Sequence, residues 1–201
     1  MKSSIIDPSQ SILVIGGGRM GGAIVNGWLR QGINPAQVHL IDRSPEAVAA
    51  YVGSLGIAGY TAIDDIPANS KFDFVLVATK PQVIAEALPA YRSFLGTDSL
   101  LISIAAGVSN DTLGRLVPGD HGIVRVMPNT PALISKGVMV GCPNEQVSIP
   151  KRHACEALFA SLGKFYWVED EELMHGVTAV SGSGPAYLFH FVESMIAAAQ
   201  A

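Results

Sequence analysis

A glycine-rich stretch near the start of the chain limits its possible fold more than any other feature. Residues 12–15, Ile-Leu-Val-Ile, are apolar and mostly β-branched, which predicts a buried strand. Gly16, Gly18 and Gly21 follow in the spacing G-x-G-x-x-G. From Met20 onward, apolar residues recur at helical spacing. This order predicts a site for the pyrophosphate of a dinucleotide, because a helix start offers free N–H groups and the positive end of its dipole.

Further apolar runs predict that this first strand belongs to a larger sheet. Helical patterns alternate with them, and we expect helices over 45–52, after Pro81 and over 149–162. The alternation predicts an α/β fold, a doubly wound, mostly parallel, Rossmann-like sheet. The strands expected after the first one are 38–41, 72–78, 100–104, 123–127, 138–140 and 165–168.

The last part of the chain follows a different pattern. Residues 173–180 are expected to be helical, Ser-Gly-Ser-Gly-Pro at 181–185 to interrupt the helix, and 186–201 to resume it. That final segment is apolar nearly all round and requires cover on every side, from a partner or from further sequence. We expect a dinucleotide domain over 1–164, and over 165–201 the beginning of a second, helical unit that stops inside a helix.

Composition narrows the functional classes. Apolar residues make up 49% of the 201 residues, and the net charge is −4 with no basic run, which disfavours nucleic acid and anionic membranes as partners. No apolar run approaches the roughly 18 residues that a transmembrane helix needs. Two cysteines predict no disulfide framework and favour the cytoplasm. His153 and Cys155 point in different directions on a predicted helix, so we expect no metal site.

The residues after the second strand give a divided signal on the cofactor. Asp42, at the end of that strand, would hydrogen-bond the ribose hydroxyls of NADH and repel a 2′-phosphate. Arg43 and Ser44 follow at once and would bind that phosphate by charge and hydrogen bond. Both cofactors therefore stay open at this point.

Other candidate residues lie at or beyond predicted strand ends, where ligands of open α/β sheets bind. Lys80 would reach a cofactor, and the small residues Ala105 and Ala106 would let a flat ring approach the backbone. Pro128 and Pro131 hold the polar side chains between them in place. For His175, a structural role is favoured over a proton donor. The candidates for contact with the reacting groups are Asn129, Thr130, His175, Thr178 and Ser181.

Several motifs together resemble those of pyrroline-5-carboxylate reductase. They are Ile-Gly-Gly-Gly-Arg-Met-Gly at 15–21, Lys-Pro at 80–81, Ser-Ile-Ala-Ala-Gly-Val at 103–108, Met-Pro-Asn-Thr-Pro at 127–131 and Val-Ser-Gly-Ser-Gly-Pro-Ala-Tyr at 180–187. The resemblance implies reduction of 1-pyrroline-5-carboxylate to L-proline by NAD(P)H, the last step of proline biosynthesis. It also implies that residues 165–201 begin an all-helical dimerisation domain, and that a homodimer, or a higher homo-oligomer, forms through the C-terminal helices.

The resemblance also implies which residues hold the cofactor, with NADPH expected and NADH as the alternative. Family members commonly carry a neutral residue where this chain has Asp42. The family's Ser-Pro-Gly-Gly-Thr substrate loop is absent from the sequence, so we expect the chain to turn over its substrate poorly or not at all. The motif spacing gives Gly21 and Asp42 as cofactor residues, and the resemblance implies Gly16, Gly18, Arg19, Met20, Arg43, Ser44, Ala78, Thr79, Lys80, Pro81, Ala105 and Ala106.

Two other functions fit parts of the pattern. A β-hydroxyacid-dehydrogenase-like enzyme shares a sheet followed by helices, but it would carry a catalytic lysine on its first long C-terminal helix. Residues 165–201 contain no lysine, which counts against that enzyme. A non-catalytic NAD(P)-binding protein is the second alternative. Cofactor binding without turnover by a longer chain that includes the family's substrate loop would favour it.

Overall fold

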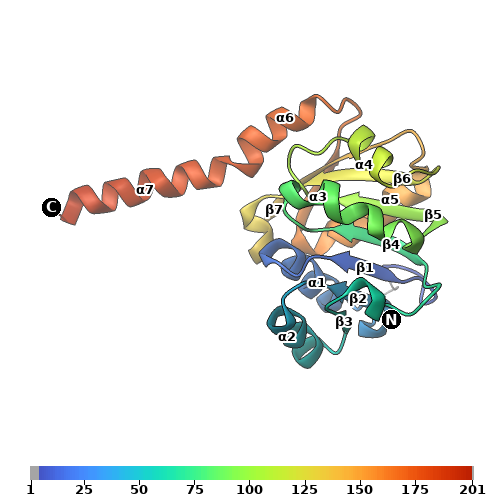
Figure 1. Cartoon of the computed structure of the whole chain (residues 1–201). Coiled ribbons are helices and arrows are strands. Elements are labelled where there is room, and N and C mark those ends of the chain that lie inside the picture. Colours follow the sequence, from blue (N-terminus) through green and yellow to red (C-terminus); the bar gives the residue numbers. More distant parts are fainter. Residues whose placement is uncertain (1–4, 201) are drawn as a thin grey trace.

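The body of the molecule is one twisted, eight-stranded sheet with helices on both faces (Figure 1). The structure is a computed structural model and describes residues 5–200. The strand order is β3-β2-β1-β4-β5-β6-β7-β8, and every neighbouring pair is parallel except β6 and β7. The strands are β1 Ile12–Ile15, β2 Val38–Ile41, β3 Ala58–Tyr60, β4 Phe72–Val77, β5 Leu95–Ser103, β6 Gly122–Met127, β7 Gly137–Pro143 and β8 Gly163–Trp167.

Helices close the two faces of the sheet, which confirms the predicted doubly wound fold. Side chains of β1 alternate between the faces: Ile12 and Val14 belong to one buried cluster, and Leu13 and Ile15 to the other. The first cluster includes residues of α1, α2 and α5, and the second includes residues of α3 and α4. These helices are α1 Arg19–Gln31, α2 Pro45–Leu55, α3 Pro81–Ala87, α4 Asn110–Leu116 and α5 Ile149–Phe159.

The sheet contains features that the apolar pattern did not predict. Strand β3, Ala58–Tyr60, has three half-buried residues and so lacks the apolar run of its neighbours. Strand β7 runs antiparallel to β6, because only the short 3₁₀ turn Thr130–Ile134 connects them. Strand β8 pairs in parallel with β7 and crosses the expected domain boundary between residues 164 and 165.

The chain stays helical where an interruption was expected. Helix α6, Leu173–Val177, continues as a π turn over Thr178–Gly182, and helix α7, Gly184–Gln200, follows. Within the turn the N–H of Ser183 donates to the carbonyl of Thr178 at 2.8 Å. The predicted break is therefore a widened helical turn. The acidic residues 169–172 precede α6.

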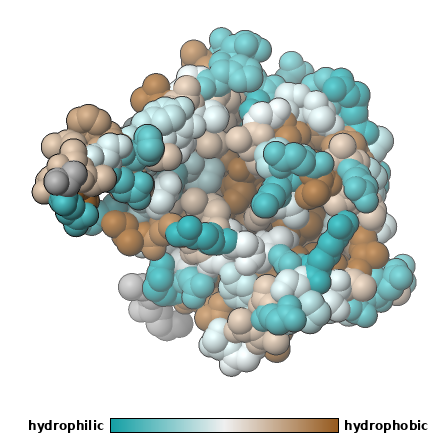
Figure 2. All heavy atoms as spheres, turned by 60° about the vertical axis from the view of Figure 1, so that its left-hand side comes forward, coloured by the Kyte–Doolittle hydropathy of each residue, from teal (hydrophilic) through white to brown (hydrophobic). Residues whose placement is uncertain are grey.

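Helix α7 projects from the body (Figure 1). Its large apolar side chains are exposed, Tyr187 at 67% and Phe191 at 63%. Figure 2 brings this helix toward the viewer and shows brown side chains on its surface. Across residues 5–200, no helix is both long and apolar enough to span a membrane.

Candidate functional site

The glycine loop connects β1 to α1 at the carboxyl edge of the sheet. Gly16 has φ +105°, and a Cβ there would lie 2.9 Å from the carbonyl oxygen of Ala78. A Cβ on Gly21 would lie 2.5 Å from the carbonyl oxygen of Gly16, so this glycine allows close packing of helix and strand. At Gly18 a Cβ would meet no atom within 4 Å. Bare backbone at Gly18 therefore faces open space at the start of α1, as a pyrophosphate site requires.

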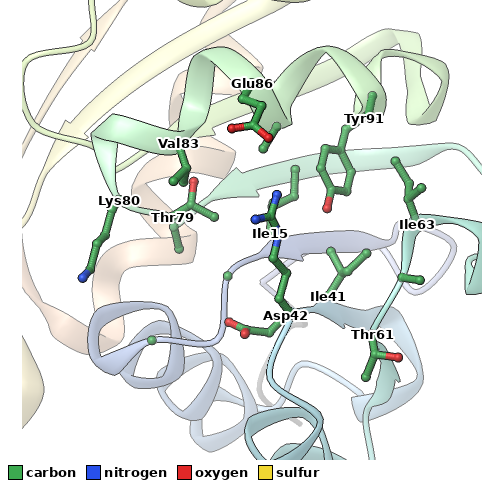
Figure 3. A pocket seen from close by; sticks show the side chains of 17 residues that line it. Ile15, Ile41, Asp42, Thr61, Ile63, Thr79, Lys80, Val83, Glu86 and Tyr91 are labelled. Atoms are coloured by element: carbon green, nitrogen blue, oxygen red, sulfur yellow. The ribbon is translucent and has the colours of Figure 1, made fainter.

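A cavity of about 550 Å³ opens beside this loop (Figure 3). Its walls come from the ends of β1, β2 and β4, from the loop after β3 and from α3 with the turn that follows it. Lys80 extends on the side where α1 begins, and Tyr91 and Ile63 lie at the opposite end. The lining residues are Ile15, Gly16, Gly18, Ile41, Asp42, Arg43, Thr61, Ala62, Ile63, Ala78, Thr79, Lys80, Val83, Glu86, Ala87, Ala90 and Tyr91.

Side chains from β2 and α2 hold the glycine loop. The carboxylate of Asp42 accepts the N–H of Gly17 at 2.6 Å with one oxygen and the N–H of Ser44 at 2.9 Å with the other. The hydroxyl of Tyr51 donates to the carbonyl oxygen of Gly17 at 2.9 Å. Burial, and secondarily the charge of Asp42, raises the pKa of Tyr51, so this hydroxyl remains a donor at neutral pH. Both polar groups of Gly17 are thus bound by side chains.

Arg43 is an exposed cation that lines the cavity just after the end of β2. Tyr91 lies near enough for the charge of Arg43 to lower its pKa, although burial, the larger effect, raises that pKa overall. The hydroxyl of Ser44 caps α2 by accepting the N–H of Ala47 at 3.2 Å, and it donates to the carboxylate of Glu46 at 2.9 Å. Within residues 5–200 the guanidinium of Arg43 therefore has free donors for an anionic ligand, whereas the hydroxyl of Ser44 is occupied.

A second group of candidates lies beyond the end of β6. Asn129 donates from Nδ2 to Oγ of Ser181 at 3.2 Å, which joins the sheet edge to the π turn. The hydroxyl of Thr178 donates within its own helix, to the carbonyl of Met174 at 2.8 Å. Thr130 is exposed, and so is His175, whose ring lies 4.0 Å from a carboxylate oxygen of Glu172. The structure brings together Asn129 and Ser181 among the five expected residues.

Half of the expected cofactor residues line the cavity, and the others lie around it. Lining it are Gly16, Gly18, Asp42, Arg43, Ala78, Thr79 and Lys80; outside it are Arg19, Met20, Gly21, Ser44, Pro81, Ala105 and Ala106. Sequence reasoning missed the wall of α3 and its continuation. The sequence signal for this wall follows a strand end and has the helical spacing i, i+4, i+7 and i+8, at Val83, Ala87, Ala90 and Tyr91. It also missed Thr61–Ile63, because it missed β3.

Two family models match the chain. The model described as "NADP oxidoreductase coenzyme F420-dependent" matches residues 11–107, and the model described as "Pyrroline-5-carboxylate reductase dimerisation" matches residues 171–201. The pyrroline-5-carboxylate reductase of Haemophilus influenzae is 41% identical over 184 residues, which are 92% of this chain and 67% of that protein.

Solved structures agree with these matches. A pyrroline-5-carboxylate reductase from Coxiella burnetii gives a TM-score of 0.85 at 30% identity, covering 96% of this chain and 71% of that one. The Plasmodium falciparum pyrroline carboxylate reductase with NADP bound gives 0.81 at 27% identity, covering 96% and 70%. The chain belongs to the pyrroline-5-carboxylate reductase family.

Proposed function

We propose that the chain reduces 1-pyrroline-5-carboxylate to L-proline with a nicotinamide nucleotide bound at the glycine-loop cavity. The observation that carries this proposal is the open backbone of Gly18 beside that cavity, in a chain that belongs to this reductase family. When bound, the nucleotide supplies a hydride to the carbon of a cyclic imine.

The work left to the protein in this reaction is mainly alignment. A protonated imine is already a good electrophile, so holding it against the cofactor and excluding water supply much of the rate. The start of α1 would hold the pyrophosphate, and the apolar wall of α3 would cover the adenosine. This division of roles agrees with a site built from backbone groups and small side chains.

A reductase assay tests the reaction. We expect the purified chain to consume reduced cofactor when 1-pyrroline-5-carboxylate is added and to form proline in equal amount, even if slowly. The matched test of the dehydrogenase alternative supplies small β-hydroxyacids and oxidised cofactor. We expect no reduction of the cofactor. Cofactor binding without proline formation, by a chain extended with the family's Ser-Pro-Gly-Gly-Thr loop, would instead support the non-catalytic NAD(P)-binding alternative.

We further propose that NADPH is the preferred cofactor, with NADH as the alternative. Both carboxylate oxygens of Asp42 already accept backbone N–H groups, whereas the guanidinium of Arg43 is exposed at the cavity. Arg43→Ala should therefore raise the dissociation constant of NADPH by about ten-fold or more, since a charge-assisted hydrogen bond contributes about 1.5–3 kcal/mol. NADH affinity should change little. Equal losses for both cofactors in titrations would contradict this assignment.

The expected domain division and dimer are proposals as well. We place the start of the helical unit after β8, because this strand completes the sheet. Helix α7 is its interface, supported by the exposed apolar side chains and by the dimerisation model over residues 171–201. Light scattering at about micromolar concentration should show association, and Phe189→Glu should weaken it more than Glu193→Gln does. A stable monomer would contradict the interface.

We also propose a cytoplasmic location. The two cysteines are buried and form no disulfide, which suits a reducing compartment.

A further inference from the structure

A chain of hydrogen bonds with a fixed direction runs from β7 to Ser181. The backbone N–H of Val138 donates to Oδ1 of Asn129 at 3.0 Å, and Nδ2 of Asn129 donates to Oγ of Ser181 at 3.2 Å. A backbone N–H can only donate, so the amide oxygen of Asn129 must face Val138 and its NH₂ group must face Ser181. Oγ of Ser181 is consequently an acceptor in this contact, and its own proton remains available.

Within residues 5–200, the hydroxyl of Ser181 accepts this one hydrogen bond and donates none. Ser181 is partly exposed, so its hydroxyl can reach a ligand. The acceptor for this proton therefore comes from outside the part of the chain that the structure describes.

The place of this donor in the fold indicates which ligand supplies the acceptor. In a doubly wound sheet, the two halves of a dinucleotide lie over the two halves of the carboxyl edge. The cavity beside β1 and β2 takes the adenosine half. Asn129 follows the end of β6, which lies on the other side of β1, beyond β4 and β5. Ser181 therefore lies on the nicotinamide side.

The π turn brings Ser181 close to that edge. Its extra residue per turn is a local departure of the kind often found at functional sites. A Cβ on the next residue, Gly182, would lie 2.3 Å from Cε of Met127, so glycine allows the turn to approach the end of β6.

We infer that the hydroxyl of Ser181 donates a hydrogen bond to the carboxamide oxygen of the bound nicotinamide, and that Asn129 is a positioning residue that orients this hydroxyl. The inference rests on the proposed function only in that the ligand is a nicotinamide nucleotide. The carboxamide oxygen is a strong acceptor, and it is confined to the nicotinamide half of the nucleotide. A donor with one free proton suits it.

Ser181→Ala tests the contact through two ligands that differ in the nicotinamide alone. We expect the dissociation constant of NADP⁺ to rise roughly two- to twelve-fold, the range for one neutral hydrogen bond. The constant for ADP-ribose 2′-phosphate, which lacks nicotinamide, should stay unchanged. If the chain prefers the other cofactor, NAD⁺ and ADP-ribose replace the pair. Ser183→Ala, two residues away, is the matched control and should change neither constant.

Asn129→Asp tests the direction of the chain of hydrogen bonds. Aspartate has nearly the same shape and still accepts the N–H of Val138, but its carboxylate can only accept. Ser181 must then donate inward, and its proton is lost to the ligand. We expect the same selective loss of NADP⁺ affinity, and no further loss when Ser181→Ala is added.

Three results would overturn the inference: unchanged NADP⁺ affinity in Ser181→Ala, equal losses for both ligands, or a raised KM for 1-pyrroline-5-carboxylate alone. The last would move the hydroxyl to the substrate. Failure of the proposed function is a separate outcome, because it would appear as absent proline formation while the difference between the two ligands persists.

Discussion

Tyr51→Phe removes one oxygen atom and isolates the part played by α2 in holding the glycine loop. The aromatic ring remains packed over Gly22, where a Cβ would lie 2.0 Å from the Tyr51 hydroxyl. What is lost is the 2.9 Å hydrogen bond to the carbonyl oxygen of Gly17. That carbonyl and the N–H of Gly18 belong to one planar, trans peptide and point in opposite directions. By drawing the carbonyl toward α2, Tyr51 turns the N–H of Gly18 away from α2.

The expected effect follows from this geometry. Without the Tyr51 hydroxyl, the peptide between Gly17 and Gly18 is free to rotate, and binding of a pyrophosphate must order it again. A neutral hydrogen bond contributes about 0.5–1.5 kcal/mol, so the dissociation constants of NADPH and NADH should both rise by roughly two- to twelve-fold. Their ratio should stay constant, because the pyrophosphate is common to both.

Fluorescence titration with each cofactor measures the two constants, and thermal unfolding shows whether the variant is folded. Tyr60→Phe is the matched control. It removes a half-buried hydroxyl that lies 3.0 Å from Nδ1 of His39, away from the glycine loop. Unchanged affinity for both cofactors in folded Tyr51→Phe, or a loss confined to one of them, would refute the reasoning.

Two further predictions concern the glycine loop and the response to pH. Gly18→Val should fold, because the φ of −67° at Gly18 is ordinary and no atom lies near the added Cβ, yet it should weaken the binding of both cofactors by blocking the pyrophosphate. Gly53→Val is the control, because Gly53 also faces open space but lies outside the cavity. Equal cofactor affinities in the two variants would contradict this prediction. Burial, and secondarily Arg92, lowers the pKa of His121 in the folded protein. The unfolded chain therefore binds a proton first, so stability is fully present above about pH 6.5 and falls as the pH drops toward the folded pKa. Urea unfolding should show a smaller acid-side loss in His121→Gln, and an identical loss would contradict the assignment.

Much of the sheet could be predicted because its strands are buried on both faces. Runs such as residues 12–15 and 74–77 have apolar side chains toward two helical layers, and this produces an unbroken apolar pattern. The edge strand β3 has a helical layer that covers it less completely, and Ala58, Gly59 and Tyr60 show no such pattern. The loop after it forms one wall of the cavity, so the missed strand also concealed part of the site.

The contacts of Asp42 within the chain could not be predicted from the sequence, because residue type and position leave several partners open. An acid at the end of β2 suits the ribose hydroxyls, but it also suits any N–H group nearby. The structure shows contacts to the N–H groups of Gly17 and Ser44, which depend on the path of the glycine loop. The bond from Asn129 to Ser181 is similar, since 52 positions separate the two residues and the π turn brings them together. Motifs identify such residues, whereas their pairing depends on the tertiary fold.

Helix α7 and the Ser181 contact are physically linked, because the helix begins only three residues after Ser181. Leu188, Phe189 and Ile196 are each more than half exposed, and burying each contributes about 1.5–3 kcal/mol. A second copy that covers them would hold α7 in one orientation, and with it the π turn. Dilution to monomers should therefore weaken the binding of NADP⁺ but not the binding of ADP-ribose 2′-phosphate. Titrations above and below the dissociation concentration found by light scattering measure this, and equal NADP⁺ affinity at both would show that the turn is held by the sheet edge alone.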